Sequence, residues 1–320
     1  MLKAAVIGLG NMGQYHAKAY SLIEEASLVA VCDPNQDRFD HIIKESHTRY
    51  YSDLLDLLSN EAIDVVSVCV PTSKHHDVAK ACINKGIHVL VEKPIAQTVE
   101  EAQALVAYAK ANQVKLTVGH IERFNPAVIK TKQLIQQQAL GDVRSIIAKR
   151  YGPFPKQIKD ANVLVDVAVH DIDIVQYLVD QPLAQSKITT QKIHCQDRAD
   201  YGHLQLTYGA NTDVNIFVSW AVPFKKRVIE IIGTKAVAMV DCISQSVTLY
   251  PVSLQQSGYD MSMPVSEPNP IEIQKKEPIV AQCLSFVQAI KNQKDPMVCP
   301  EQATQALDLA LQSAQGVPAN

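Results

Sequence analysis

The stretch Ala4-Ala5-Val6-Ile7-Gly8-Leu9-Gly10-Asn11-Met12-Gly13 decides how the first half of the chain folds. Four apolar residues typical of a strand run directly into G-x-G-x-x-G, and an amphipathic segment follows. Gly8 permits a tight turn, Gly10 lets backbone amides approach a bound group, and Gly13 lets a helix pack closely on the strand. The order strand, turn, helix therefore predicts a site for the pyrophosphate of a dinucleotide.

An acidic residue ends the next predicted strand, Leu28 to Cys32. Asp33 can accept hydrogen bonds there from both hydroxyls of an adenosine ribose. The 2′-phosphate of NADP would place a like charge against this carboxylate, at a cost on the order of several kcal/mol, and Arg38 alone does not outweigh it. The sequence therefore favours NAD as the cofactor. The ordinary alternative for Asp33 is a turn residue before Pro34.

Short apolar runs alternate with helix-like segments up to about residue 120, which is typical of a parallel sheet covered on both faces. The predicted strands are 4–7, 28–32, 65–70, 88–91 and 115–118, with helices such as 77–84 and 99–111. After residue 120 the pattern indicates helices at 126–138 and 163–178, and strands between 143 and 252 that form an antiparallel sheet. Residues 255–270 are predicted to be a surface loop, and helices at 279–291 and 301–312 follow.

The fold class expected from this pattern is α/β, with a second domain of α+β type. Residues 1–120 are predicted to form a Rossmann domain, a doubly wound parallel sheet that binds NAD. Residues 121–320 are predicted to form a substrate-binding and oligomerisation domain with a large, mainly antiparallel, open-faced sheet. The last helix, about 301–313, can pack back on the first domain. Because so large a sheet face usually needs covering, we expect a homodimer or homotetramer.

Composition excludes several classes of function. A formal net charge of -3 gives no basic field for a nucleic acid, and no window of eighteen apolar residues is present to cross a membrane. The seven cysteines are odd in number and scattered, without a C-x-x-C pair, so reduced thiols in the cytoplasm are expected. The first residues lack the features of a signal peptide. A metal site is not predicted, because His75 and His76 are adjacent at a helix start, so that their side chains point in different directions. The ordinary interpretation of this pair is an exposed polar cap.

Glu92-Lys93-Pro94 follows the predicted strand at 88–91. A lysine at the carboxyl end of a parallel strand points into the crevice where open α/β sheets bind ligands, and there it can donate to a substrate hydroxyl. Pro94 fixes its own backbone angle and restricts Lys93 as well. Taken alone, a lysine in this position is more often a solvated surface charge than a catalytic group.

Asp166 and His170 lie in the first turns of the predicted helix at 163–178. Residues four apart share a helix face, so the carboxylate can orient the imidazole and stabilise its charged form. Such a histidine can accept a proton from an alcohol. The alternative is a structural histidine inside the protein with Asp166 as its hydrogen-bond partner.

Together, Gly8 to Gly13, Glu92-Lys93-Pro94 and Asp166-x-x-x-His170 resemble the glucose-fructose oxidoreductase, inositol dehydrogenase and rhizopine-catabolism family over essentially the whole chain. The resemblance implies that Lys93, Asp166 and His170 line the active site. The cofactor-binding residues that we expect are Gly8, Gly10, Asn11, Met12, Gly13, Asp33, Arg38, Pro71, Thr72, His75, Glu92 and Lys93.

Residues 118–126 and 150–155 resemble the branch of this family that acts on UDP-N-acetylglucosamine at its 3-hydroxyl. The resemblance implies that His120, Arg123, Asn125 and Arg150, together with Asp166 and His170, lie near the sugar or its diphosphate, since guanidinium groups suit phosphate oxygens. The second motif departs from the usual pattern, because Ala168 stands where a glycine is common.

The expected reaction is oxidation of a sugar hydroxyl to a ketone. The hydroxyl would lie between Lys93 and His170, with hydride passing to NAD+, the proton to His170, and Lys93 stabilising the alkoxide. Other substrates within the enzyme class are a free cyclitol, a monosaccharide and a UDP-N-acetylhexosaminuronic acid. A catalytically idle NAD-binding regulator is the alternative from another class.

Overall fold

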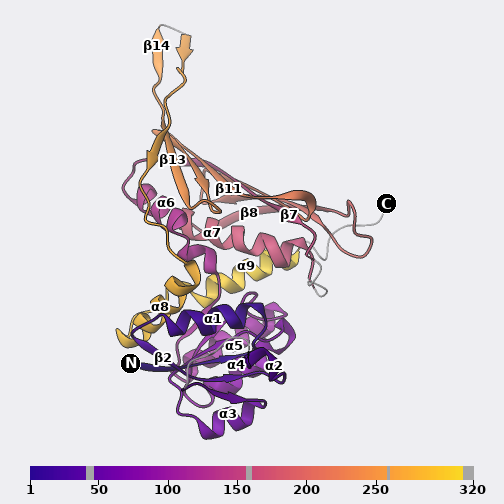
Figure 1. Cartoon of the computed structure of the whole chain (residues 1–320). Helices are drawn as coiled ribbons and strands as arrows, with labels where there is room; N and C mark the ends of the chain where they lie inside the picture. Colours follow the sequence, from indigo (N-terminus) through magenta and orange to yellow (C-terminus); the bar gives the residue numbers. More distant parts are fainter. Residues whose placement is uncertain (41–46, 156–160, 258–259, 313–320) are drawn as a thin grey trace. The chain divides into compact units, whose positions relative to one another are not determined.

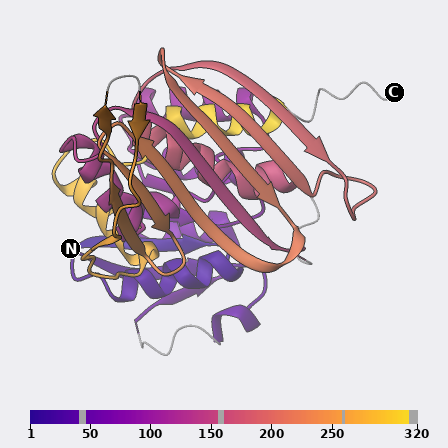
Figure 2. The same ribbon diagram turned by 90° about the horizontal axis from the view of Figure 1, so that it is seen from above.

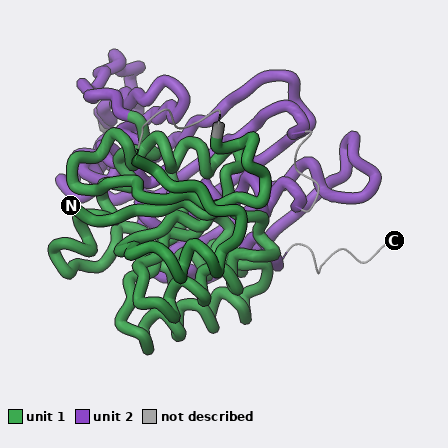
Figure 3. The backbone as a smooth tube through the Cα atoms, turned by 60° about the horizontal axis from the view of Figure 1, so that its bottom comes forward, with its two compact units in different colours: residues 1–121, 277–308 green, residues 122–276, 309–320 purple. Residues whose placement is uncertain are grey.

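The computed structural model describes residues 1–40, 47–155, 161–257 and 260–312. Contacts divide the chain into two compact units (Figure 3). Unit 1 contains residues 1–121 and 277–308, and unit 2 contains residues 122–276 and the residues from Leu309 onward. The chain therefore passes from unit 1 to unit 2 after Ile121, returns to unit 1 at Glu277, and passes to unit 2 again at Leu309.

Unit 1 is built on a six-stranded parallel sheet with the strand order β3-β2-β1-β4-β5-β6 (Figure 1). Its strands are β1 Leu2–Ile7, β2 Ala26–Cys32, β3 Arg49–Tyr51, β4 Val65–Val68, β5 His88–Val91 and β6 Leu116–Val118. Every residue of β4 is buried, as expected for a strand covered on both faces. The order reverses between β1 and β4, which places a ligand crevice at the carboxyl ends of these strands. The predicted doubly wound fold is confirmed.

The helices of unit 1 connect these strands and cover the sheet. They are α1 Asn11–Ser21, α2 Asp37–Asp40, α3 Leu54–Asn60, the 3-10 turn η1 Thr72–Lys74, α4 His75–Ile83, α5 Val99–Ala111 and α8 Pro278–Lys291. Asp53 caps α3 by accepting hydrogen bonds from two backbone N–H groups, and Thr98 with Glu101 forms a capping box at α5. The short strand β3 and the short helix α3 were not predicted from the sequence.

Helix α8 belongs to unit 1, although it follows unit 2 in the sequence. Cys283, Phe286 and Val287 are buried in one apolar cluster with Ala17 and Tyr20 of α1. The expected boundary at residue 120/121 assigned residues 277–308 to the second domain with only the last helix able to pack back. The contacts instead place all of α8 and the first part of α9, Pro300–Gln312, in unit 1.

Unit 2 is built on an eight-stranded sheet with the order β16-β13-β12-β11-β7-β10-β9-β8 (Figure 2). Its strands are β7 Val143–Pro153, β8 Leu183–Gln191, β9 Tyr201–Tyr208, β10 Thr212–Ser219, β11 Ala221–Gly233, β12 Ala236–Asp241, β13 Ser246–Pro251 and β16 Asn269–Ile271. All neighbours are antiparallel except β7 and β10, which are parallel. The prediction of a large, mainly antiparallel sheet is confirmed.

Two helices, α6 Pro126–Gln136 and α7 Val169–Val179, pack on one face of this sheet. Alternate residues of β7, among them Ile146, Ala148 and Arg150, point to that buried side. In Figure 2 the opposite face is turned to the viewer, and no helix among the described residues of unit 2 crosses it. Side chains on that open face include the stacked pair His203 and Phe217.

The structure differs from expectation at two further places in unit 2. Residues 255–270 were expected to be a loop, but they contain a hairpin of β14 Gln255–Ser257 with β15 Asp260–Ser262, and β16 begins at Asn269. The predicted helix at 163–178 begins with a π-helical turn, η3 Leu164–Ala168, before α7. The residues from Val163 to Val169 are apolar except for Asp166, so a shift of the helical periodicity by one residue does not stand out, and the sequence indicated a continuous helix.

Candidate active site

The glycine turn, Gly8 to Gly13, joins β1 to α1 in unit 1. Gly8 has a φ of 89°, and a Cβ on it would lie 2.6 Å from the carbonyl oxygen of Cys69. A Cβ on Gly13 would lie 1.8 Å from the carbonyl oxygen of Gly8, whereas Gly10 faces open space. Gly10 precedes α1 and has no side chain to cap it, so the first N–H groups and the positive dipole end of α1 can receive an anion. The turn therefore fits a dinucleotide pyrophosphate.

Asp33 follows β2 and is almost fully buried beside the glycine turn. Its Oδ2 accepts hydrogen bonds from the backbone N–H of Leu9 at 2.6 Å and from Nη1 of Arg38 at 3.1 Å. Its Oδ1 accepts one from the backbone N–H of Asn35 at 2.9 Å. Asp33 is thus more than a turn residue, because its carboxylate ties the end of β2 to the turn at the place where an adenosine ribose binds in this fold.

Glu92 and Lys93 follow β5, at the carboxyl edge of the same sheet. Lys93 is partly buried, and its peptide bond to Pro94 is cis. The Glu92 carboxylate is buried; its Oε1 lies 2.9 Å from Nε2 of His16, and its Oε2 accepts a hydrogen bond from the backbone N–H of Lys93 at 3.1 Å. Both oxygens of Glu92 are therefore engaged by groups of unit 1.

The residues predicted after β4 lie at the same edge of the sheet. Pro71 precedes η1 and Thr72 begins it, both at least partly exposed. His75 was expected to form an exposed polar cap, but its ring is buried, with Nδ1 2.8 Å from the carbonyl oxygen of Pro94 and Nε2 2.9 Å from that of Val70. His75 therefore bridges the backbone at Val70 and at Pro94. The residues next to His75 in the sequence do not indicate these contacts.

His120 follows β6 in unit 1 and is buried, whereas the other predicted substrate residues belong to unit 2. Asp166 lies in η3 and His170 in the first turn of α7, and both are partly buried. Their four-residue spacing, which predicted a shared α-helical face, spans the junction between the π-helical turn and α7.

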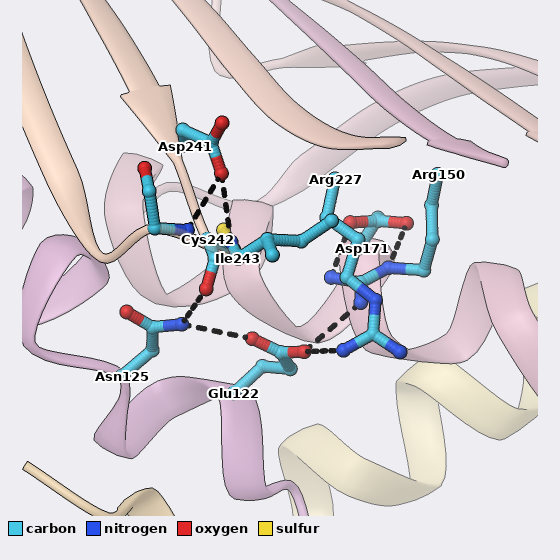
Figure 4. Close-up of polar contacts among 9 residues, drawn as sticks. Glu122, Asn125, Arg150, Asp171, Arg227, Asp241, Cys242 and Ile243 are labelled. Atoms are coloured by element: carbon cyan, nitrogen blue, oxygen red, sulfur yellow. Dashed lines mark hydrogen bonds and ion pairs between the residues drawn. The ribbon is translucent and has the colours of Figure 1, made fainter. Parts of the chain in front are cut away.

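Glu122, Arg150, Asp171 and Arg227 form a charged cluster inside unit 2 (Figure 4). Nε and Nη2 of Arg150 donate to the two carboxylate oxygens of Asp171 at 2.8 and 3.0 Å. Nη1 of Arg150 donates to Oε1 of Glu122 at 3.0 Å, and Nη1 of Arg227 donates to the same oxygen at 3.2 Å. Burial acts to raise the pKa of Glu122, but the charges of the two arginines lower it below its usual value. The cluster thus joins the 3-10 turn η2 Ile121–Phe124 to β7, β11 and α7.

A second buried ion pair anchors α7. Nε and Nη2 of Arg123 lie 2.8 Å from the two carboxylate oxygens of Asp173, and both side chains are 1% exposed. Asn125 accepts a hydrogen bond from the backbone N–H of Ala127 at the start of α6 and donates to the carbonyl oxygen of Cys242. Three residues predicted to contact substrate therefore make buried contacts within unit 2, namely Arg123, Asn125 and Arg150.

Sequence reasoning missed the partners of these groups. The signal was present, because aspartates at 171 and 173 stand among apolar residues of a helix and a buried carboxylate needs a cation. Glu122 and Arg227 gave no such signal, since they meet only in the folded chain. The residues that the sequence did not select are His16, Glu122, Asp171, Asp173 and Arg227.

Residues 1–40, 47–155, 161–257 and 260–312 contain no group of three or more His, Cys, Asp or Glu side chains placed to hold a metal ion. In the same residues, no helix combines the length and the apolar character needed to cross a membrane.

Two family profiles match the chain in succession. The first, described as an oxidoreductase family with an NAD-binding Rossmann fold, matches residues 2–120. The second, described as the GFO/IDH/MocA C-terminal domain, matches residues 128–239. The chain belongs to the GFO/IDH/MocA oxidoreductase family. NAD is therefore its cofactor, in agreement with the fit of the glycine turn and Asp33.

Relatives of known name within the GFO/IDH/MocA family span nearly the whole chain. A UDP-N-acetylglucosamine 3-dehydrogenase of Acidithiobacillus ferrooxidans is 29% identical over 93% of this chain and 91% of its own length. A scyllo-inositol 2-dehydrogenase (NAD(+)) of Bacillus subtilis is 27% identical over 97% of this chain and 92% of its own length. The crystal structure of the Acidithiobacillus enzyme, GnnA, superimposes with a TM-score of 0.86 at 27% identity, covering 97% of this chain and 96% of that one. The chain is thus a member of a family of NAD-dependent sugar and polyol dehydrogenases.

Proposed function

We propose that this oxidoreductase oxidises the 3-hydroxyl of UDP-N-acetylglucosamine, or of a related UDP-amino sugar, to a ketone. The observation that carries the proposal is the position of Lys93, directly after β5 at the carboxyl edge of the sheet that bears the glycine turn. Similarity to a UDP-N-acetylglucosamine 3-dehydrogenase over 93% of the chain supports this choice of substrate.

The proposed roles follow from the chemistry of three side chains. NAD+, when bound, supplies the hydride acceptor. Lys93 donates a hydrogen bond to the substrate oxygen and stabilises the negative charge that develops there. His170 accepts the hydroxyl proton as the general base, and Asp166 favours the charged form of that imidazole.

Arg123, Asn125 and Arg150 receive a supporting role in this proposal. Their side chains are nearly fully buried and already hydrogen-bonded to Asp173, Cys242 and Asp171 respectively. Recruiting either arginine to a phosphate would leave a buried carboxylate unpaired, at a cost of about 3 to 5 kcal/mol. We therefore assign them to fixing η2, β7 and α7.

Oxidation of an inositol is the second candidate. The scyllo-inositol 2-dehydrogenase matches 97% of the chain at nearly the same identity. The same lysine, histidine and aspartate could act on a ring hydroxyl of a cyclitol, so the two candidates differ in the substrate and not in the proposed proton transfer.

The test is NADH formation at fixed NAD+ with UDP-N-acetylglucosamine, its uronic acid, scyllo-inositol, myo-inositol and simple hexoses. We expect the highest kcat/KM with UDP-N-acetylglucosamine.

His170→Ala should lower kcat by about a hundredfold to ten-thousandfold, and Lys93→Ala should also lower kcat while NAD binding persists. A higher kcat/KM with an inositol would replace the proposed substrate. Tight NAD binding without turnover on any compound would favour a regulator.

We also propose that the enzyme is a homodimer or homotetramer. The open face of the unit 2 sheet exposes apolar side chains such as Ile232 and Met239, and burial of such a face against a second copy is favourable. Light scattering of the purified chain tests this, and a monomer at micromolar concentration would contradict it.

A further inference from the structure

The Glu92 carboxylate is held on both of its oxygens. Oε1 lies 2.9 Å from Nε2 of His16, and Oε2 accepts the backbone N–H of Lys93 at 3.1 Å. A carboxylate with two directed contacts keeps one orientation. The backbone of Lys93 is therefore tied to the same carboxylate that meets the buried histidine.

His16 lies on α1, one turn after the glycine turn, and its side chain is fully buried. Its second ring nitrogen, Nδ1, lies 3.5 Å from Sγ of Cys283 on α8. The imidazole thus stands between α8 on one side and Glu92 on the other. Through these contacts the helix that begins at the pyrophosphate site is connected to the segment that carries Lys93.

The space around Glu92 is closed on a further side by Gly119, which follows β6. A Cβ on Gly119 would lie 2.6 Å from Oε1 and 3.1 Å from Oε2 of Glu92. Only glycine leaves room for the carboxylate there, unless the carboxylate moves. The position of Glu92 is therefore fixed by packing as well as by hydrogen bonds.

The charges of His16 and Glu92 are complementary. Burial acts to lower the pKa of His16, but Cys69 and Cys283 raise it, and the net direction is upward. Burial acts to raise the pKa of Glu92, but the hydrogen bond and charge of His16 lower it below its usual value. Both directions favour an imidazolium facing a carboxylate, which is a charge-assisted hydrogen bond.

The titratable groups near His16 come from four segments of unit 1. They are Glu92 after β5, Cys69 after β4, Cys283 on α8 and Tyr20 on α1 itself. Glu92 is the group among these four that also contacts the backbone of Lys93. Any effect of His16 on the lysine therefore has a direct route through that carboxylate.

We propose that His16 is a positioning residue for Lys93, acting through Glu92. The proposal rests on the proposed function in so far as Lys93 acts on the substrate. It assigns to α1 a second task besides holding the pyrophosphate, because the same helix sets the direction of the lysine segment. A reacting group displaced by about 1 Å can cost a hundredfold in rate.

A double-mutant cycle with His16→Leu and Glu92→Gln tests this coupling. We expect His16→Leu to lower kcat by about a hundredfold while KM for NAD+ stays within about threefold. The conservative His16→Gln, which keeps an N–H donor near the Nε2 position, should recover most of kcat. If His16 acts through Glu92, the double variant should be no slower than the slower single variant.

Tyr20→Phe is the matched control. Tyr20 lies four residues further along α1, is equally buried, and its hydroxyl lies 3.1 Å from Oγ of Ser67. Removing that hydroxyl takes one buried hydrogen bond from the same helix without touching Glu92. Its kcat should therefore match that of the wild type, even where its stability falls as much as that of His16→Gln.

Hydrogen exchange of the Lys93 amide in the cofactor-free protein gives a second readout that needs no substrate. Protection of this amide should fall in His16→Leu and stay unchanged in Tyr20→Phe. Multiplicative effects of the two substitutions on kcat, or unchanged protection in folded His16→Leu, would overturn the proposal. Should the wild type oxidise none of the sugars tested, the proposed function fails, and the exchange measurement alone decides the role of His16.

Discussion

The glycine turn of unit 1 and the charged cluster of unit 2 differ in how far apart in the sequence their interacting residues lie. In the turn, the packing of Gly8 against Gly13 involves residues five apart in the sequence. In the cluster, Arg150 meets Asp171 across 21 residues, and Arg227 meets Glu122 across 105. A motif whose partners are neighbours can be recognised from order alone. For a charged residue whose partner is distant in the sequence, the sequence gives the chemical type of the side chain but not the group that it binds.

This difference explains why the arginines looked like phosphate ligands. An arginine fork suits a phosphate and a carboxylate equally well. Inside unit 2 the carboxylates of Asp171 and Asp173 take that place. Substitutions at Arg150, Asp33 and Glu122 test whether the cluster is a structural element and whether the turn region is a binding element.

The largest effect is expected from Arg150→Met. This substitution leaves the buried carboxylates of Asp171 and Glu122 without their main cation, so the free energy of unfolding should fall by about 3 to 5 kcal/mol. Urea unfolding followed by circular dichroism measures it. Arg144→Met is the matched control, because Arg144 makes an exposed ion pair with Asp142, which contributes about 0 to 1 kcal/mol. Equal losses in the two variants would free Arg150 for a role as ligand.

A smaller effect is expected from Asp33→Ala in the turn region. Removing the carboxylate abolishes its repulsion of a 2′-phosphate and its hydrogen bonds to a ribose, so the ratio of kcat/KM for NAD+ over NADP+ should fall by about tenfold to a hundredfold. Steady-state kinetics with both cofactors measures the ratio. Arg38→Ala, which keeps Asp33, should not move the preference toward NADP+. An unchanged ratio in Asp33→Ala would show that another feature selects the cofactor.

The smallest effect concerns the pH dependence of stability through Glu122. Its pKa is lowered in the folded protein relative to the usual value of 4.5, so the unfolded state binds the proton more readily. The stabilisation is therefore fully present above pH 4.5 and is lost as the pH falls through the folded pKa. The difference in Tm between wild type and Glu122→Gln should be greatest near neutral pH and should shrink below pH 4.5. A difference that stays constant down to pH 3 would contradict this direction.

Much of unit 1 could be predicted, because β1, the glycine turn and α1 depend on residues adjacent in sequence. The three-residue strand β3 and the short α3 were missed, since so few residues carry no clear periodicity. The π-helical turn at Leu164–Ala168 was missed for a different reason, because its residues are nearly all apolar and a shift of the periodicity by one residue does not stand out among them.

The candidate site was predictable to a similar degree. The position of Lys93 after β5 followed from its motif, and the place of Asp33 beside the turn followed from its spacing. His16 could not be predicted as a site residue, because its partner Glu92 lies 76 residues away and no residue near His16 in the sequence indicates that contact. The catalytic roles of Lys93, Asp166 and His170 stay predictions.

The return of α8 to unit 1 has a consequence for the order in which the protein matures on the ribosome. Residues 122–276 emerge before the helix that packs against Ala17 and Tyr20. Until residue 291 has been synthesised, the nascent Rossmann unit has an apolar surface of α1 in contact with water. A fragment cut at residue 120 would carry the same exposed surface permanently, so the two units are not separable pieces of the polypeptide.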